Sequence, residues 1–325
     1  MKVSTIERSI ILINPEDSIT KKISIAIPVY NNAESLPILF DGILKQFEQI
    51  ALASLEIVFV DDGSTDLSWY VITELKKSNP DLIVAVKLSR NFGQLAAMIA
   101  GWDLASGDAV INISADLQDP PEIIGAMVNE WLEGSELVIG IREERKDKLT
   151  SRFTSALAHK IVKSSYPDMP DTWFDVTLMS RRVMDVVTSL KGRFRFSQGD
   201  MLYAGFKKSY VPYTRAKRPF GRSGYDFWKR VKNFTDTVLD SSYLLIQFFI
   251  RLGVVFSLAS IVYALWIIIA RVCNWIPSTG WAPIMIVILV TSGIMMIMLG
   301  IIAEYLWRIY DSTRNKPVYV IEEKL

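Results

Sequence analysis

Two uninterrupted apolar runs constrain this chain more than any other feature of its sequence. Leu252 to Ala270 covers 19 residues and Trp281 to Ala303 covers 23, and neither run contains a charged side chain. A helix of about 20 apolar residues is long enough to cross the hydrocarbon core of a bilayer. Two buried helices of a soluble core are the alternative, but the runs lack the polar periodicity of such helices. The sequence therefore predicts a transmembrane hairpin of two helices.

The residues around the two runs predict how the hairpin is oriented. Lys and Arg concentrate before the first run, at 229–232, and after the second, at 308–316, whereas the connecting loop offers only Arg271. Loops rich in Lys and Arg stay on the cytoplasmic side of a membrane. Residues 1–17 contain only a short apolar stretch and do not resemble a secretory signal. We therefore expect both termini to lie in the cytoplasm.

Rare side chains narrow the chemistry that the chain can perform. The chain has one cysteine, Cys273, and one histidine, His159. A single cysteine cannot form a disulfide within the chain, and a single histidine cannot build a zinc site based on histidines. A metal ion, if the protein uses one, is expected to be held by oxygen atoms.

The part of the chain before the apolar runs alternates short β-branched segments with amphipathic ones. This alternation is typical of an α/β protein with a mainly parallel sheet that helices cover on both faces. Ligands of such sheets bind beyond the carboxyl ends of the strands. Strands are predicted at 23–29, 56–60, 83–88, 109–113 and 137–140, and helices at 35–49, 66–78, 93–105 and 121–131.

Polar residues follow each of the five predicted strands, so we expect them to meet at one edge of the sheet. They are the segment Pro28 to Asn32, then Asp61 with Asp62, Arg90 with Asn91, Asp116 and Arg142. The first strand is followed by P-V-Y-N-N and not by a G-x-G-x-x-G turn. The absence of that turn disfavours a dinucleotide-dependent oxidoreductase, because no helix end can then approach a pyrophosphate closely.

Two acidic stretches at this edge suggest a site for a nucleotide and a metal ion. Asp116 and Gln118 can place oxygens on one side of a divalent ion that neutralises a diphosphate. The structural alternative is an acidic turn that caps the helix beginning near Pro121. Asp61 and Asp62 present two carboxylates, more than helix capping requires, and are suited to accept hydrogen bonds from a base or a ribose.

A basic segment leads to the first apolar run. Residues 201–232 contain nine Lys or Arg and one acid, Asp226. Such a segment is often a solvated face, but this one adjoins the predicted membrane span and contains R-P-F-G-R-S-G-Y, whose glycines predict a mobile loop. Within Asp226 to Tyr243, apolar residues share one helical face, which predicts an amphipathic helix in the membrane interface. One soluble substrate and one anionic lipid substrate are therefore expected.

An ordered set of motifs resembles family 2 polyprenyl-phosphate glycosyltransferases, which include dolichyl-phosphate mannose synthase and bacterial undecaprenyl-phosphate glucosyl and aminoarabinosyl transferases. The motifs are P-V-Y-N-N-A-E-S-L-P, V-D-D-G-S-T-D, S-R-N-F-G-Q, A-D-L-Q-D-P-P-E, L-M-S-R, R-x-x-G-x-S at 218–223, and E-Y-L-W-R-I-Y with K-P-V-Y. The resemblance covers Lys22 to about Tyr319. It implies a GT-A fold, which is Rossmann-like, and inverting transfer of one sugar from a nucleotide diphosphate sugar, with UDP expected, to polyprenyl phosphate.

The resemblance also implies roles for individual residues. Asp116 and Gln118 would hold Mg2+ or Mn2+, and Asp116 and Asp175 are the expected catalytic residues. The expected nucleotide-binding residues are Pro28, Tyr30, Asn32, Asp61, Asp62, Asn91, Ala115 and Asp116. The residues expected to bind a phosphate or the acceptor are Arg142, Arg152, Arg215, Arg218 and Ser223.

Three positions depart from the family pattern: Ser114 replaces the usual Asp, Asn32 the usual Glu, and Thr177 an Arg found in many relatives. Ser114 removes one anionic ligand, yet its hydroxyl can hold a metal-bound water and the donor diphosphate supplies oxygens. We therefore expect a weaker metal site that still operates. Asp175 stands at a position often proposed as a catalytic base. Because a phosphate monoester has a second pKa of about 6, we favour a positioning role for Asp175 over base catalysis.

The expected organisation has five parts: an arm at 1–21, a cytosolic GT-A domain at 22–213, a basic loop with the interface helix at 214–243, two membrane helices at 244–306, and a cytosolic tail at 307–325. We expect a multi-pass protein of the bacterial inner membrane that binds no nucleic acid. Gly293 and Gly300 leave room for helix packing in a homo-oligomer. The alternatives are a catalytically impaired nucleotide-binding scaffold and a processive polysaccharide synthase, which the absence of a Q-x-x-R-W motif disfavours.

Overall fold

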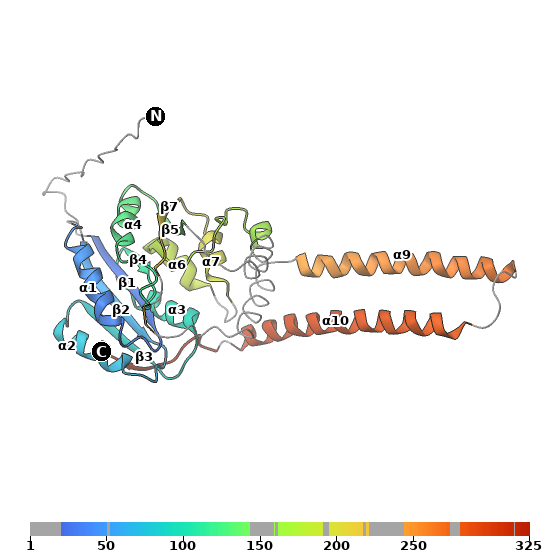
Figure 1. Cartoon of the computed structure of the whole chain (residues 1–325), viewed down its shortest axis with the longest axis horizontal. Helices are drawn as coiled ribbons and strands as arrows, with labels where there is room; N and C mark the ends of the chain where they lie inside the picture. Colours follow the sequence, from blue (N-terminus) through green and yellow to red (C-terminus); the bar gives the residue numbers. More distant parts are fainter. Residues whose placement is uncertain are drawn as a thin grey trace, which may run out of the picture.

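The chain folds around a mixed β-sheet, from which two long helices project on one side (Figure 1). The computed structural model describes residues 21–50, 53–143, 159, 162–190, 195–216, 219–220, 244–273, 280–314 and 316–325. Within these residues the sheet has eight strands in the order β7-β5-β6-β4-β1-β2-β3-β8.

All five predicted strands are confirmed and run in the same direction. They are β1 (Lys21–Val29), β2 (Ala53–Asp61), β3 (Ile83–Leu88), β4 (Ala109–Asn112) and β5 (Leu137–Arg142). The strand β6 (Thr177–Ser180) lies antiparallel between β4 and β5, and β7 (Lys208–Tyr213) pairs in parallel with β5. Because β6 is antiparallel to both neighbours, β5 keeps the direction of β4. The carboxyl ends of the five predicted strands therefore reach one edge of the sheet.

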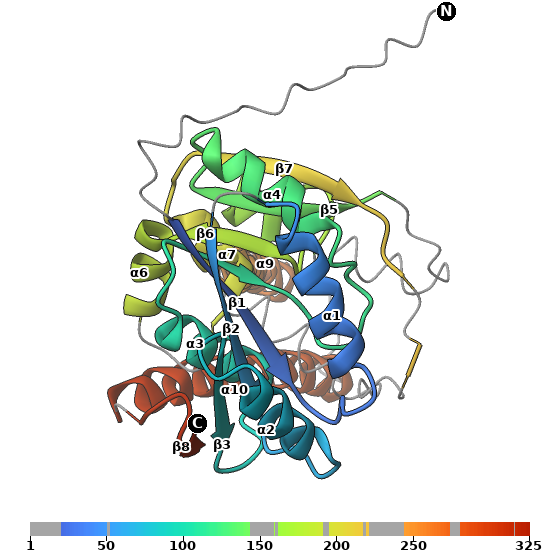
Figure 2. The same cartoon turned by 90° about the vertical axis from the view of Figure 1, so that its left-hand side faces the viewer.

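Helices cover both faces of the sheet, as the alternation in the sequence predicted (Figure 2). One face carries α1 (Leu36–Phe47), α2 (Ser68–Ser78) and α4 (Ile123–Leu132). The other face carries α3 (Gln94–Leu104), α6 (Arg181–Ser189) and α7 (Ser197–Tyr203). Local sequence explains where two of them begin. Pro37 stands in the first turn of α1, where a missing N–H costs nothing, and the Ser180 hydroxyl caps α6 by accepting the Val183 N–H at 3.3 Å.

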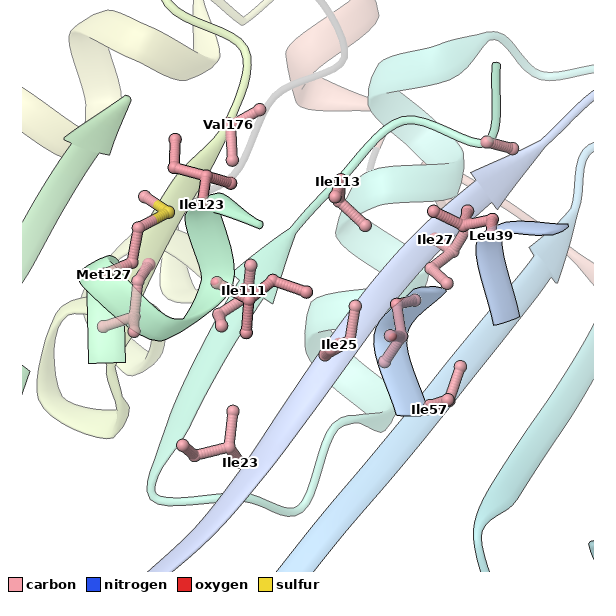
Figure 3. Packing of buried hydrophobic residues seen from close by; sticks show 14 of the residues in the cluster. Ile23, Ile25, Ile27, Leu39, Ile57, Ile111, Ile113, Ile123, Met127 and Val176 are labelled. Atoms are coloured by element: carbon pink, nitrogen blue, oxygen red, sulfur yellow. The ribbon is translucent and has the colours of Figure 1, made fainter. Parts of the chain in front are cut away.

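The period of two along β1 divides its side chains between the two cores. Ile23, Ile25 and Ile27 are fully buried against the face that α1 and α4 cover (Figure 3). Ala26 points to the opposite face, where Gly101 of α3 approaches so closely that an added Cβ would lie 3.1 Å from the Ala26 Cβ. Each buried isoleucine contributes about 1.5–3 kcal/mol relative to an exposed one, so this central strand anchors the fold.

The end of the chain returns to the sheet. The strand β8 (Ile321–Lys324) pairs antiparallel with β3, next to which the C-terminus lies in both views of the molecule (Figures 1 and 2). The Leu325 N–H donates to the Ala85 carbonyl at 2.8 Å, and the Tyr319 hydroxyl donates to the Asp103 carboxylate at 2.9 Å. The tail therefore forms the outermost strand of the sheet beside β3.

Both apolar runs lie in helices, which confirms this part of the predicted hairpin. The first run falls within α9 (Leu244–Val272), and the second within α10 (Trp281–Thr313). In the described part of the chain, one helical stretch, Val290–Thr313, is long and apolar enough to cross a membrane. The multi-pass topology stays a prediction. The predicted interface helix, Asp226 to Tyr243, lies outside the described residues.

A buried glutamate joins three segments at the amino-terminal end of the sheet. The Glu56 carboxylate accepts hydrogen bonds from Lys22 Nζ at 2.8 Å, Ser24 Oγ at 2.5 Å and the Ser106 N–H at 2.7 Å. Burial alone would raise the pKa of Glu56, but these hydrogen bonds together lower it from 4.5 to about 2. Because the folded-state pKa is lowered, Glu56 stabilises the protein above pH 4.5, and this stabilisation disappears as the pH falls toward 2.

We expect Glu56→Gln to reduce the free energy of unfolding at pH 7 by about 3 kcal/mol, because a shift of one pKa unit corresponds to about 1.4 kcal/mol. Urea unfolding of the two proteins, followed by circular dichroism from pH 7 down to about pH 3, measures the effect. The difference between them should shrink as the pH falls. Glu48→Gln, which changes an exposed glutamate, is the matched control. A difference that stays constant over this range would contradict the assignment.

Candidate active site

The loops after β1 and β2 form one end of the candidate site. Asn31 has a positive φ of 55°, and its amide oxygen accepts the Thr65 N–H at 2.8 Å. The Asn32 N–H donates to Ser68 Oγ at 2.8 Å. These bonds tie P-V-Y-N-N to D-D-G-S-T-D and to the start of α2, and they leave Tyr30 47% exposed beside the loop. The structure therefore brings the predicted nucleotide residues of these two loops together.

Asp61 and Asp62 are both buried but have different surroundings. The two carboxylate oxygens of Asp62 accept the N–H groups of Phe92 at 2.7 Å and Gly93 at 2.9 Å. Asp61 Oδ2 accepts the Ser64 N–H at 3.2 Å, whereas its Oδ1 has no hydrogen-bond partner among the described residues. Burial raises the pKa of both carboxyls. Asp62 thus shapes the loop after β3, and Asp61 keeps an acceptor for another group.

Gly63 lets the loops after β2 and β3 touch backbone to backbone. Its φ is 67°, and a Cβ at this position would lie 2.6 Å from the Arg90 carbonyl carbon and 2.7 Å from the Asn91 nitrogen. No residue with a side chain fits without moving one loop. This close contact places the predicted residue Asn91, which is exposed, at the same edge as Asp61.

The loop after β4 holds the predicted metal ligands. Asp116 is 7% exposed, and its Oδ1 accepts both Ser114 Oγ at 2.9 Å and the Gln118 N–H at 3.1 Å. Leu117 between them has a positive φ of 57°. The Ala115 carbonyl accepts Ser35 Oγ at 2.6 Å, which fixes this loop to the start of α1. Ser114 therefore directs its hydroxyl toward the carboxylate that the family pattern assigns to the metal.

A second group of charged residues surrounds Asp175. The Asp175 Oδ2 accepts a hydrogen bond from Arg142 and lies 3.9 Å from the Arg215 guanidinium. Arg142 Nε donates to the Tyr213 hydroxyl at 3.3 Å, and that hydroxyl donates to Asp119 at 2.9 Å. The structure thus brings three predicted site residues together, Arg142, Asp175 and Arg215.

Burial and neighbouring charges shift the pKa values of this group in opposite directions. Burial raises the pKa of Asp119, and the Arg215 guanidinium only partly counteracts this effect. Burial also raises the pKa of Tyr213, so its hydroxyl keeps its proton. Burial alone would lower the pKa of Arg142, but the neighbouring carboxylate of Asp175 keeps this pKa above its usual value. Two guanidinium groups therefore face one partly exposed carboxylate.

Backbone contacts place this charged group next to the loop after β4. The Ala216 N–H donates to the Gln118 carbonyl at 2.9 Å, which holds the segment after β7 against that loop. The Asn112 side-chain amide donates to the Asp175 carbonyl at 3.2 Å. The predicted metal ligands and the arginines therefore form neighbouring parts of one site.

Sequence reasoning missed two residues of the site, Asp119 and Tyr213. Asp119 belongs to A-D-L-Q-D-P-P-E, but the prolines after it gave the stretch the appearance of a turn. Tyr213 ends Y-V-P-Y, whose alternating burial was obscured by the surrounding basic residues. Three predicted residues, Arg152, Arg218 and Ser223, lie outside the described residues.

The architecture is that of enzymes that bind nucleotide sugars at the carboxyl edge of a mainly parallel sheet. Residues 24–187 match Glycosyl transferase family 2. An uncharacterized glycosyltransferase of Synechocystis is 33% identical over 306 residues, which are 94% of this chain and 96% of that protein. The SfII prophage-derived bactoprenol glucosyl transferase of Shigella flexneri is 33% identical over 304 residues, which are 93% and 98% of the two chains.

A solved structure supports the fold. The mannosyl-3-phosphoglycerate synthase from Rubrobacter xylanophilus superimposes with a TM-score of 0.51 at 18% identity, over 67% of this chain and 72% of that chain. The protein is therefore a glycosyltransferase with the GT-A fold. The chain belongs to Glycosyl transferase family 2.

Proposed function

We propose that this glycosyltransferase moves one sugar, with inversion, from a nucleotide diphosphate sugar, with UDP as the expected nucleotide, to polyprenyl phosphate. The observation that carries the proposal is the convergence of Arg142 and Arg215 on Asp175, beside the loop with Asp116. A pair of guanidinium groups suits a phosphate, and α10 contains a stretch that can cross a membrane. The name of the Shigella relative, a bactoprenol glucosyl transferase, also supports a lipid acceptor.

The donor would occupy the edge between the loops after β1 and β4. Tyr30 and Asp61 would contact the nucleoside: Tyr30 is half exposed, and Oδ1 of the buried Asp61 has no hydrogen-bond partner within the described part of the chain. This end would also be shaped by Pro28, Asn32 and Asp62, whose contacts lie mainly within the sheet and its loops.

The loop after β4 suits a magnesium or manganese ion. Asp116 offers a carboxylate and Gln118 an amide, which are the hard oxygen ligands that these ions prefer. No cluster of three acidic, histidine or cysteine residues that could hold a metal occurs in the described part of the chain. Oxygens of the donor diphosphate and a water held by Ser114 would have to complete the site. A bound ion would offset the negative charge that develops on the leaving diphosphate.

The acceptor phosphate would bind at Arg142 and Arg215. In the transfer step, a phosphate oxygen forms a bond to the anomeric carbon, and the bond from that carbon to the donor diphosphate breaks. The electron pair leaves with the nucleoside diphosphate. Asp175 would pair with the arginines before the acceptor binds and then position the acceptor, because a phosphate monoester needs little deprotonation near neutral pH.

The placement in the cell is part of the proposal. We infer a multi-pass enzyme of the bacterial inner membrane with α9 and α10 as its spans. The GT-A domain at 22–213, the basic loop and interface helix at 214–243, and both termini would lie on the cytoplasmic side. The cytoplasmic surface is where nucleotide sugars and the basic residues flanking the apolar runs would be found together. A homo-oligomer that packs through Gly293 and Gly300 is compatible with this arrangement.

Purified full-length protein in detergent, mixed with undecaprenyl phosphate and a panel of labelled nucleotide sugars, tests the proposal. We expect one lipid-linked sugar product that EDTA abolishes and that added Mg2+ or Mn2+ restores. Nucleotide binding with no lipid product from any donor would favour a membrane scaffold. Long polymeric products would favour a polysaccharide synthase.

A further inference from the structure

Asp119 is a fully buried carboxylate that the transfer step does not use directly. Its side chain is 0% exposed, and its Oδ1 accepts the Tyr213 hydroxyl at 2.9 Å. The same oxygen lies 3.8 Å from Arg215 Nε. A buried carboxylate is costly unless hydrogen bonds and a charge partner compensate it. Here the two partners are Tyr213, which contacts Arg142, and Arg215, and both arginines belong to the proposed acceptor end of the site.

Tyr213 connects Asp119 to the second arginine. Its hydroxyl donates its hydrogen to Asp119 and accepts a hydrogen bond from Arg142 Nε at 3.3 Å. The residue is 5% exposed, so water does not replace either contact readily. The orientation of the Arg142 guanidinium is therefore linked to a carboxylate that it does not touch.

The two carboxylates of the group differ in their access to solvent. Asp175, which pairs with both arginines, has a side chain that is 43% exposed, whereas Asp119 is fully buried. An incoming anion can exchange with the exposed carboxylate without opening the core. The buried carboxylate of Asp119 stays in place during such an exchange. It keeps its contact with Arg215 and, through Tyr213, its link to Arg142.

We propose that Asp119 and Tyr213 are positioning residues for the acceptor phosphate: they keep Arg142 and Arg215 in place while the lipid phosphate takes over from Asp175 as the partner of both arginines. This inference rests on the proposed lipid acceptor. Asp119 and Tyr213 therefore act through the arginines and not on the donor. A purely structural pair would affect the folded fraction or both substrates alike, whereas a positioning pair affects the acceptor selectively.

The selective effect is measured with steady-state kinetics of the full-length enzyme in detergent. Tyr213→Phe removes one hydroxyl and should raise KM for undecaprenyl phosphate about tenfold, the size expected for a lost hydrogen bond to a charged group. KM for the nucleotide sugar should stay within about twofold, since no donor contact changes. Asp119→Asn keeps an acceptor for the Tyr213 hydroxyl but removes the charge beside Arg215, so the same acceptor-selective rise is expected.

The double variant tests whether the two residues act as a unit. Because both act on the same pair of arginines, the combined rise in KM should be smaller than the product of the single effects. Tyr210→Phe is the matched control, because Tyr210 lies on the same strand, is 41% exposed and faces away from the group. It should leave both KM values unchanged.

Two further outcomes separate the possible failures. If the wild-type enzyme transfers sugar to the lipid but Tyr213→Phe changes both KM values equally or neither, the positioning role is wrong while the proposed function stands. If the wild-type enzyme binds nucleotide sugar yet gives no lipid product, the proposed function is wrong and this inference falls with it.

Discussion

Asp116→Asn is expected to reduce sugar transfer by about two to three orders of magnitude, an effect comparable to removing one electrostatic contact in an active site. Asp116 is the sole carboxylate in I-S-A-D-L-Q, so no neighbour in that stretch replaces its charge. The fold should persist, because an asparagine oxygen can still accept the hydrogen bonds from Ser114 Oγ and the Gln118 N–H.

Initial rates at saturating lipid and nucleotide sugar, measured across a range of Mg2+ and Mn2+ concentrations, give the size of this loss. Thermal unfolding in the same detergent shows whether the variant stays folded. Asp81→Asn serves as the control, because Asp81 is an exposed carboxylate in the turn before β3, at the opposite edge of the sheet. Near wild-type rates for Asp116→Asn would remove this residue from the metal site.

Arg142→Ala should lower kcat/KM for the lipid acceptor by about two orders of magnitude or more, because truncating a buried, hydrogen-bonded charge typically costs 2–5 kcal/mol. Its side chain is 11% exposed and reaches both Asp175 and Tyr213, so no other described arginine takes over its position. Arg142→Lys should recover only part of the loss, since lysine keeps the charge but not the planar fork of donors.

The affinity of the Arg142 variants for the nucleotide sugar is the measurement to compare with their kcat/KM for the lipid acceptor. The affinity for nucleotide sugar, measured by calorimetry without lipid, should change little, because the proposed donor end lies at the loops after β1, β2 and β4 and does not include Arg142. Arg182→Ala is the matched control: this arginine is 71% exposed and pairs with Glu136 away from the site. An equal loss of donor affinity and acceptor efficiency in Arg142→Ala would place the residue at the donor instead.

The parts of the fold that follow from local patterns could be predicted from the sequence. Each predicted helix in the sheet region begins and ends within about three residues of the observed one. Amphipathic spacing marks α1, α2 and α4, whereas α3 is buried throughout Ala96 to Trp102 and is identified by its length between two strands. Three strands were missed: β6 with four residues, β7 within the basic segment, and β8 with the sequence I-E-E-K. Neither β6 nor β8 has a length or an alternation that identifies a strand, and the basic residues around β7 obscure its alternation. Pairing with segments far away in the sequence decides their conformation: β6 pairs with β4 and β5, β7 with β5, and β8 with β3.

The residues of the site also fall into two groups: those that local patterns in the sequence predict and those that depend on contacts between distant segments. Arg142 and Asp116 come within a few residues of the ends of predicted strands, so the rule that strand ends meet at one edge was enough to place them. Asp119 and Tyr213 are separated by 94 residues, and their hydrogen bond depends on β7 pairing beside β5. No spacing in the sequence predicts that pairing. The resemblance to a family supplied Asp175, whose charged partners only the three-dimensional arrangement shows.

The pairing of β8 with β3 limits how the sheet can move relative to α10. The chain leaves the sheet region before α9 and rejoins the sheet after α10, and only residues 314–320 separate the end of α10 from β8. Seven extended residues span at most about 25 Å. Because pairing with β3 holds β8 in the sheet, the end of α10 must stay within this distance of the outermost strand. The short connection therefore limits how far the sheet can move away from the end of α10.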